Sequence, residues 1–209
     1  MAEQTKVKTL EKVVIRFSGD SGDGMQLTGT IFSNLSAVFG NEISTFPDYP
    51  AEVRAPQGTL SGVSGFQVHL GSRKIFTPGD KADVLVAMNP AALKVNVKHL
   101  KPNAIVLIDT DSFKKSDLDK ALFTELGLTG VQVVAAPIST MVKDGLVEFG
   151  LDNKSALRCK NMFALGLVCW LFERPLEEAM HMLQNKFAKK PVIAQANIKA
   201  LTDGYNYGN

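Results

Sequence analysis

The chain has 209 residues, of which 45% are apolar and 21% charged, a composition typical of a globular protein with one substantial core. A net charge of +2 gives no reason to expect a nucleic-acid or membrane partner. Cys159 and Cys169 fit no common zinc spacing and are too few for an ordinary iron–sulfur cluster. With a polar N-terminus and no long apolar run, the sequence indicates a cytoplasmic protein with reduced thiols.

The first predicted elements are a strand, a glycine-rich turn and a helix, in the stretch VVIRFSGDSGDGMQLTG from Val13 to Gly29. The run at 13–17 is typical of a buried strand. Apolar residues then recur at helical spacing up to Gly40, which is placed like a C-terminal cap. This order is the opening unit of a Rossmann-like α/β domain. Glycines suit the turn because they permit tight backbone angles and let a ligand phosphate reach bare N–H groups at the helix N-terminus.

The glycine turn supports two interpretations. Its glycines are spaced G-x-x-G-x-G rather than G-x-G-x-x-G, and Asp20 and Asp23 would repel a pyrophosphate. In one interpretation Asp20 or Ser21 caps the helix and Asp23 complements its dipole. In the other interpretation the turn contacts a ligand directly. The candidate ligand-contacting residues are Gly19, Asp20, Ser21, Gly22, Asp23 and Gly24.

A second strand is predicted at 42–46, followed by a long connection at 47–61, PDYPAEVRAPQGTLS. Its prolines exclude regular structure. Because long loops in compact domains are often functional, we take Arg54 as a candidate recognition residue, the alternative being a solvated surface loop. Alternation at 63–70 predicts a half-buried strand, with antiparallel pairing as an option, and a hairpin over 71–76 would follow.

Strands alternate with helices from residue 83 onward, which indicates a mostly parallel sheet with right-handed crossovers. In such sheets ligands bind outside the carboxyl ends of the strands. Those ends are the glycine turn, Asn89, Asp109 and 137–140. We expect them to meet at one edge and take Asn89 as a further ligand-contacting candidate. The predicted strands are 83–88, 104–108 and 131–135, and the predicted helices are 91–100 and 116–126.

The last third of the chain is predicted to be helical. The segment 161–172 is apolar all round, so we expect it to be buried or to pack on a partner. Another helix begins near Pro175, and a final helix at 191–203 is closed by Gly204. The predicted fold is therefore an α/β, Rossmann-like three-layer domain with a mostly parallel sheet and a helical C-terminal third. Residues 1–11 are expected to be flexible, 12–204 to form a single domain, and 205–209 to begin a linker.

Nothing in the sequence indicates a self-contained catalytic centre. It has no GxSxG elbow, no HExxH motif and no Walker loop. Phosphate recognition is the function that the residues favour, and it would require cations near the glycine turn to offset the aspartates. The candidate cations are Arg16, Arg54, Arg73 and Lys74.

Two long motifs carry a resemblance to a known family. IRFSGDSGDGMQLTG followed by TFPDYPAEVRAPQGTLSGVSGFQVHLG closely resembles the gamma domain of 2-oxoacid:ferredoxin oxidoreductases, and most closely the 2-oxoglutarate type. In that type the gamma domain is usually the N-terminal part of a fused gamma–alpha subunit. The shorter pieces ADVLVAMN, AAPIS and NMFALG also look like this family. The resemblance extends from about Val13 to Gly204 and implies that 205–209 lead to an alpha domain, fused or separate.

The resemblance implies a role in a larger enzyme. The family oxidatively decarboxylates a 2-oxoacid onto coenzyme A and passes electrons to ferredoxin. Thiamine diphosphate, Mg and iron–sulfur clusters are held by the alpha and beta subunits, so we expect no catalytic group and no metal on this chain. The gamma domain helps shape the coenzyme A site and the subunit interface. The residues that would face coenzyme A or the partner subunits are Gly19 to Gly24, Arg54 and Asn89.

One departure from the family pattern affects the turn. Many gamma domains have GxGGxG there, whereas aspartates replace its middle in this chain, a variant that suits the 2-oxoglutarate branch. Two alternatives to the gamma-domain hypothesis stay open. One is a Rossmann-like nucleotide- or flavin-binding module, and the other is a purely structural interface protein that binds no small ligand.

Overall fold

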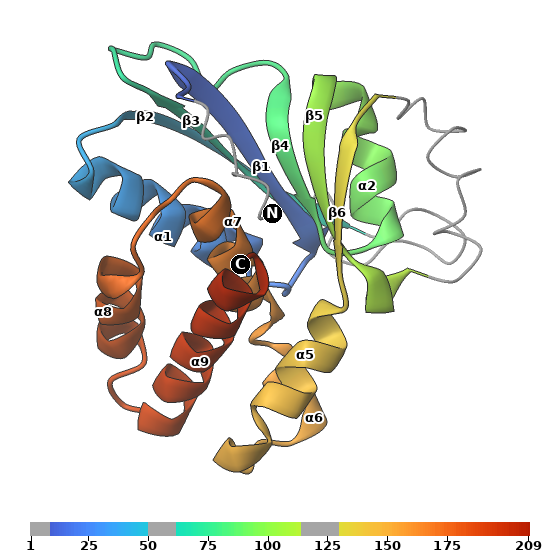
Figure 1. Cartoon of the computed structure of the whole chain (residues 1–209), viewed down its shortest axis with the longest axis vertical. Helices are drawn as coiled ribbons and strands as arrows, with labels where there is room; N and C mark the ends of the chain where they lie inside the picture. Colours follow the sequence, from blue (N-terminus) through green and yellow to red (C-terminus); the bar gives the residue numbers. More distant parts are fainter. Residues whose placement is uncertain (1–8, 50–61, 114–129) are drawn as a thin grey trace, which may run out of the picture.

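The computed structural model describes residues 9–49, 62–113 and 130–209. Within them the strands form one six-stranded sheet in the order β2-β3-β1-β4-β5-β6 (Figure 1). The pairs β1–β4, β4–β5 and β5–β6 are parallel, and β3 pairs antiparallel with β1 and β2. The predicted, mostly parallel α/β sheet is confirmed. The strands are β1 Lys12–Asp20, β2 Glu42–Asp48, β3 Val63–Gly71, β4 Ala82–Ala87, β5 Leu100–Asp109 and β6 Gln132–Ala136.

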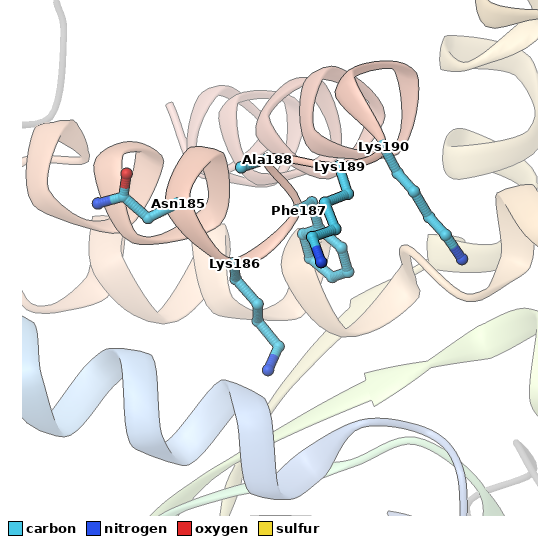
Figure 2. A pocket seen from close by; sticks show the side chains of 6 residues that line it. All are labelled: Asn185, Lys186, Phe187, Ala188, Lys189 and Lys190. Carbon is cyan, nitrogen blue, oxygen red and sulfur yellow. The ribbon is translucent and has the colours of Figure 1, made fainter.

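Helices cover both faces of the sheet, which gives three layers. In Figure 1, α1 and α7–α9 lie on one face and α2 on the other, here called the α2 face. The described helices are α1 Met25–Val38, α2 Pro90–Asn96, α5 Ile138–Gly145, α6 Asn153–Leu157, α7 Lys160–Leu171, α8 Glu177–Lys186 and α9 Pro191–Tyr207. Short 3-10 turns lie at Val97–His99, Thr110–Ser112 and Val147–Phe149. A cavity of about 470 Å³ opens at the turn between α8 and α9 (Figure 2).

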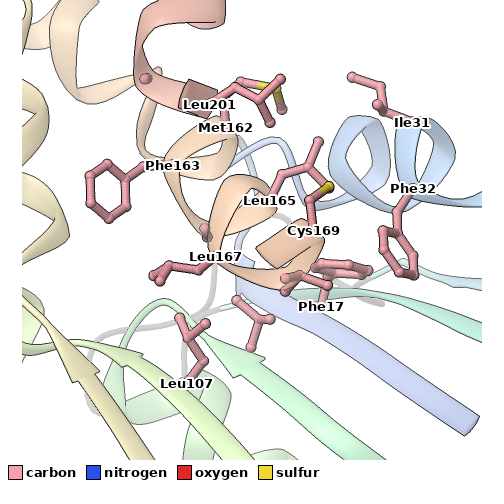
Figure 3. Close-up of a cluster of buried hydrophobic side chains, with 14 of the residues drawn as sticks. Phe17, Ile31, Phe32, Leu107, Met162, Phe163, Leu165, Leu167, Cys169 and Leu201 are labelled. Atoms are coloured by element: carbon pink, nitrogen blue, oxygen red, sulfur yellow. The ribbon is translucent and has the colours of Figure 1, made fainter. Parts of the chain in front are cut away.

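The main core lies between the sheet and α7. Alternate residues of β1 point to opposite faces, so Phe17 joins the cluster around α1 and α7 while Val14 joins the smaller cluster under α2. Figure 3 shows α7 at the centre of the larger cluster, with its own Phe163 extending from it and Phe17 and Phe32 nearby. Because α7 is apolar all round, it can be buried on every side, as predicted.

Two glycines let α7 and α9 approach until their backbones touch. A Cβ on Gly204 would lie 2.0 Å from the carbonyl oxygen of Phe163, and one on Gly166 would lie 2.1 Å from that of Leu201. Gly204 therefore serves helix packing. The prediction that it ends the last helix was wrong, because α9 continues to Tyr207. Gly40, by contrast, has a φ of 79° and follows α1 as a C-terminal cap.

Other local predictions are corrected by tertiary contacts. The strand β3 is mostly buried rather than half-buried, and its polar Gln67 is satisfied there by donating to the carbonyl oxygens of Pro78 and Gly79. The segment 71–76 forms no second hairpin strand, and Phe76 is 83% exposed. The strand β5 begins at Leu100, earlier than the predicted 104–108, and includes residues 101–103. The predicted helix at 116–126 lies outside the described residues, and the proposed domain boundaries stay predictions.

Candidate functional site

The glycine turn joins the end of β1 to the start of α1. Gly22 and Gly24 have φ angles of 109° and 77°, and the N–H of Asp23 donates to the carbonyl oxygen of Asp20 at 3.0 Å. Gly24 is the N-cap of α1, and no side chain in the part of the chain that the structure describes caps the helix. The interpretation in which Asp20 or Ser21 caps α1 was therefore wrong. The glycines are required because a side chain rarely adopts such positive φ angles.

The carboxylate of Asp23 folds back over its own turn. Its Oδ2 accepts from the N–H of Asp20 at 2.9 Å, and a Cβ on Gly19 would lie 2.8 Å from that oxygen. Burial raises the pKa of Asp23 above its ordinary value, while the hydrogen bond from Asp20 and the charge of Lys160 act in the opposite direction. A carboxylate thus lies where a dinucleotide fingerprint would place a phosphate.

The first turn of α1 offers donors and an acceptor. Among residues 9–49, 62–113 and 130–209, no side chain caps its N–H groups, and no acidic residue lies in the first helical turn. Gln26 donates through Nε2 to the carbonyl oxygen of Gly65 at 2.7 Å. Its Oε1 is buried and has no hydrogen-bond partner in the structure as described. An uncapped helix N-terminus is chemically suited to a polar or anionic ligand, and the same turn carries the unpaired acceptor of Gln26.

The N-terminus of α7 reaches the glycine turn and the end of β5. Asn161 donates through Nδ2 to the carbonyl oxygen of Gly24 at 3.4 Å, and Lys160 places Nζ 3.7 Å from Oδ2 of Asp109. Sequence reasoning missed both residues, because only the packing of α7 on the sheet brings them here. The available signal was the polar pair Lys160 and Asn161 at the start of the apolar segment KNMFALG.

The expected convergence of strand ends is confirmed. The N–H of Met88, at the end of β4, donates to the carbonyl oxygen of Ser18 at 3.0 Å. Asp109 is fully buried, and its carboxylate accepts two hydrogen bonds from Ser139. The N–H of Ser139 donates at 3.2 Å and the hydroxyl of Ser139 donates at 2.7 Å. Asp109 also accepts from the hydroxyl of Ser112 at 2.8 Å. Asp109 therefore ties β5 to the start of α5 instead of facing an open site.

Asn89 lies at the same edge but has a structural contact there. Its Oδ1 accepts from the N–H of Ala92 at 2.8 Å and caps the N-terminus of α2. A contact between Asn89 and a ligand stays a prediction.

Arg54 lies outside the described residues, yet both ends of its segment are next to the glycine turn. The N–H of Ser21 donates to the carbonyl oxygen of Gly62 at 3.2 Å. Gln26 reaches the carbonyl oxygen of Asp48 at 3.5 Å. The chain therefore leaves the described structure after Tyr49 and returns at Gly62 beside the candidate site.

The other predicted cations do not lie at the turn. Arg16 is buried on the α2 face, where its guanidinium donates to Asn96, Gln67 and Asp48. Arg73 and Lys74 follow the end of β3, at which Gly71 pairs with Lys12, the first residue of β1. They are at the opposite end of β1 from the glycine turn. The prediction that these three residues offset the aspartates was wrong, and Lys160 provides the nearby positive charge instead.

Other reactive groups are scarce in the structure as described. Burial raises the pKa of Cys159 to about 11 and that of Cys169 to about 12, so both thiols are protonated at neutral pH. No group of three His, Cys, Asp or Glu side chains in residues 9–49, 62–113 and 130–209 is placed to hold a metal ion. In the same ranges no helix is long and apolar enough to cross a bilayer.

Comparison with known proteins gives a consistent set of relatives. Residues 14–207 match the family model described as pyruvate ferredoxin/flavodoxin oxidoreductase. The 2-oxoglutarate oxidoreductase subunit KorA of Mycobacterium tuberculosis (strain ATCC 25618 / H37Rv) is 50% identical over 204 residues. That match covers 95% of this chain and 31% of KorA, so the chain spans about a third of this relative.

Solved structures show the same architecture. One similar structure is the 2-oxoglutarate:ferredoxin oxidoreductase of Magnetococcus marinus, which was solved with 2-oxoglutarate, coenzyme A and succinyl-CoA bound. The two chains have a TM-score of 0.75 and 27% sequence identity, and the match covers 96% of this chain and 31% of the Magnetococcus chain. The gamma subunit of the keto/oxoacid ferredoxin oxidoreductase of Geobacter sulfurreducens has a TM-score of 0.66 and 23% identity, over 94% of this chain and 98% of its own. At this low identity, the similarity to the Geobacter subunit shows a shared fold and nothing about function.

Proposed function

Because the chain belongs to the pyruvate ferredoxin/flavodoxin oxidoreductase family, we propose that it is the gamma component of a 2-oxoglutarate:ferredoxin oxidoreductase. In this proposal it acts with alpha and beta subunits, which reduce ferredoxin, and it has no activity alone. Thiamine diphosphate, Mg and iron–sulfur clusters belong to those subunits, where they supply the decarboxylation and electron transfer. The chain contributes one wall of the coenzyme A site and part of the subunit interface.

The observation that carries the proposal is the uncapped N-terminus of α1, whose first turn also carries the unpaired Oε1 of Gln26. Coenzyme A carries phosphates, which the N–H groups at a helix N-terminus can bind. It also carries amide N–H groups, which can donate hydrogen bonds to a carbonyl oxygen such as Oε1 of Gln26. The segment that contains Arg54 begins and ends at the same place. A contact between the Arg54 guanidinium and a coenzyme A phosphate would fit this arrangement. The ligand-contacting residues proposed are Gly19, Asp20, Ser21, Gly22, Asp23, Gly24, Arg54 and Asn89.

The nucleotide- or flavin-binding alternative is less well supported. The Asp23 carboxylate covers Gly19 and uses the N–H of Asp20, so a pyrophosphate in the usual fingerprint position would meet a negative charge. We therefore propose that any phosphate contact is made at the first turn of α1 rather than above Gly19. The purely structural alternative would leave the first-turn N–H groups and Gln26 without a ligand.

The proposal is tested by omission. The alpha and beta subunits are assayed for 2-oxoglutarate- and coenzyme A-dependent reduction of a viologen dye, with and without this chain. We expect activity only when all components are present and none from the chain alone. Equal activity without the chain, or turnover by the chain alone, would contradict the proposal.

A further inference from the structure

The turn between α8 and α9 gathers three cations away from the glycine turn. Lys186, Lys189 and Lys190, here called the lysine turn, line the cavity of about 470 Å³ together with Asn185, Phe187 and Ala188. Figure 2 shows the three lysine side chains extending from the same side of the turn, around the ring of Phe187. All three lysines are exposed.

No acidic residue neutralises these cations in the part of the chain that the structure describes. The ion pairs found there involve Arg16, Lys101, Lys160 and Lys199, and none includes a member of the lysine turn. Lys190 is moreover the N-cap of α9, and Lys189 precedes it. The helix dipole disfavours positive charge at this end. Lys189 and Lys190 are therefore placed where the isolated chain gains nothing from their charge, whereas Lys186 lies in the last turn of α8, where a positive charge is favourable.

The backbone that carries the lysines is held firmly. The N–H of Phe187 donates to the carbonyl oxygen of Leu183 at 3.0 Å, and the N–H of Lys190 donates to that of Phe187 at 2.7 Å. The ring of Phe187 packs against the main core. A charged surface on a fixed backbone loses little conformational entropy when a partner binds.

We propose that the lysine turn is a docking surface for an acidic segment of a partner protein, namely one of the other subunits of the complex. A protein segment suits it better than a small anion, because the cavity combines three separated cations with the apolar surface of Phe187 and Ala188. The whole chain has a net charge of +2, so the rest of the chain without these three lysines has a slightly negative net charge. The lysine turn would therefore orient the chain toward an acidic partner. The choice of partner rests on the proposed function.

The experiment compares two triple variants with equal change of charge. One is Lys186→Gln, Lys189→Gln and Lys190→Gln. The control is Lys94→Gln, Lys143→Gln and Lys154→Gln, at three exposed lysines that form no ion pair in residues 9–49, 62–113 and 130–209. Association of each chain with the alpha and beta subunits is measured over a range of salt concentrations. We expect the lysine-turn variant to bind at least roughly ten-fold more weakly at low salt and with a flatter salt dependence. The control should stay within about two-fold of the unmodified chain.

A second readout separates docking from folding. Lys190→Glu places an acid at the N-terminus of α9 and should raise the thermal midpoint of the isolated chain while weakening association. Equal association of the lysine-turn and control variants would overturn the inference, and so would a Lys190→Glu variant that binds as tightly as the unmodified chain. If the unmodified chain itself fails to bind the subunits, it is the proposed function that fails.

Discussion

The carboxyl edge of the sheet and the lysine turn use charge in opposite ways. At the edge, Asp109 and Asp23 accept hydrogen bonds from nearby protein groups, and Lys160 lies 3.7 Å from Asp109. At the lysine turn, three cations form no ion pair with any part of the chain that the structure describes. The edge charges therefore hold strands and helices in place, whereas the lysine charges are presented to the outside.

The contrast follows from burial. A buried carboxylate must be satisfied by protein donors, because leaving it or its partners unpaired costs several kcal/mol. An exposed ammonium keeps its water, so its presence costs the fold little and its removal also costs little. Substitutions of the buried carboxylates at the edge should thus act on stability, and those at the lysine turn should act on association.

The largest expected effect is that of Asp109→Ala. It would leave both donor groups of Ser139 and the hydroxyl of Ser112 without their acceptor, and it would remove the anion next to Lys160. We expect a loss of about 3–5 kcal/mol in the free energy of unfolding, measured by urea denaturation. Lys189→Ala at the lysine turn serves as the comparison and should change that free energy by less than about 0.5 kcal/mol. A loss below about 1 kcal/mol for Asp109→Ala would contradict the structural role of this carboxylate.

A smaller, pH-dependent effect is expected for Asp23→Asn. Since burial raises the pKa of Asp23, the folded state disfavours its charged form, and this costs stability above that pKa. The Asn side chain can still accept from the N–H of Asp20 without carrying a charge. We therefore expect a small rise in the thermal midpoint at neutral pH. The gain should fade as the pH falls through the raised pKa of Asp23 and disappear well below 3.8, the ordinary aspartate pKa, where the carboxyl is neutral in both the folded and the unfolded state. A gain that does not change with pH would contradict the desolvation argument.

Much of this architecture could be predicted because it depends on local patterns. The β-branched run of β1, the apolar periodicity of α1 and the glycines of the turn each determine their own element, and alternation of strands and helices then brings the strand ends together. The contacts of Lys160, Asn161 and Arg16 depend instead on how distant elements pack. Gly204 illustrates the limit, because a glycine that ends a helix and one that lets two helices touch look alike in a sequence.

The most direct test of the central claim is the Michaelis constant for coenzyme A in the reconstituted complex. Arg54→Ala is compared with Arg73→Ala, whose residue follows β3 at the opposite end of β1 from the glycine turn. If this edge is a wall of the coenzyme A site, Arg54→Ala should raise the Michaelis constant for coenzyme A by roughly ten-fold or more, because a hydrogen bond to a charged phosphate contributes about 1.5–3 kcal/mol. The Michaelis constant for 2-oxoglutarate should stay unchanged. Arg73→Ala should change neither constant. Unaltered coenzyme A kinetics in the Arg54→Ala complex would contradict the account.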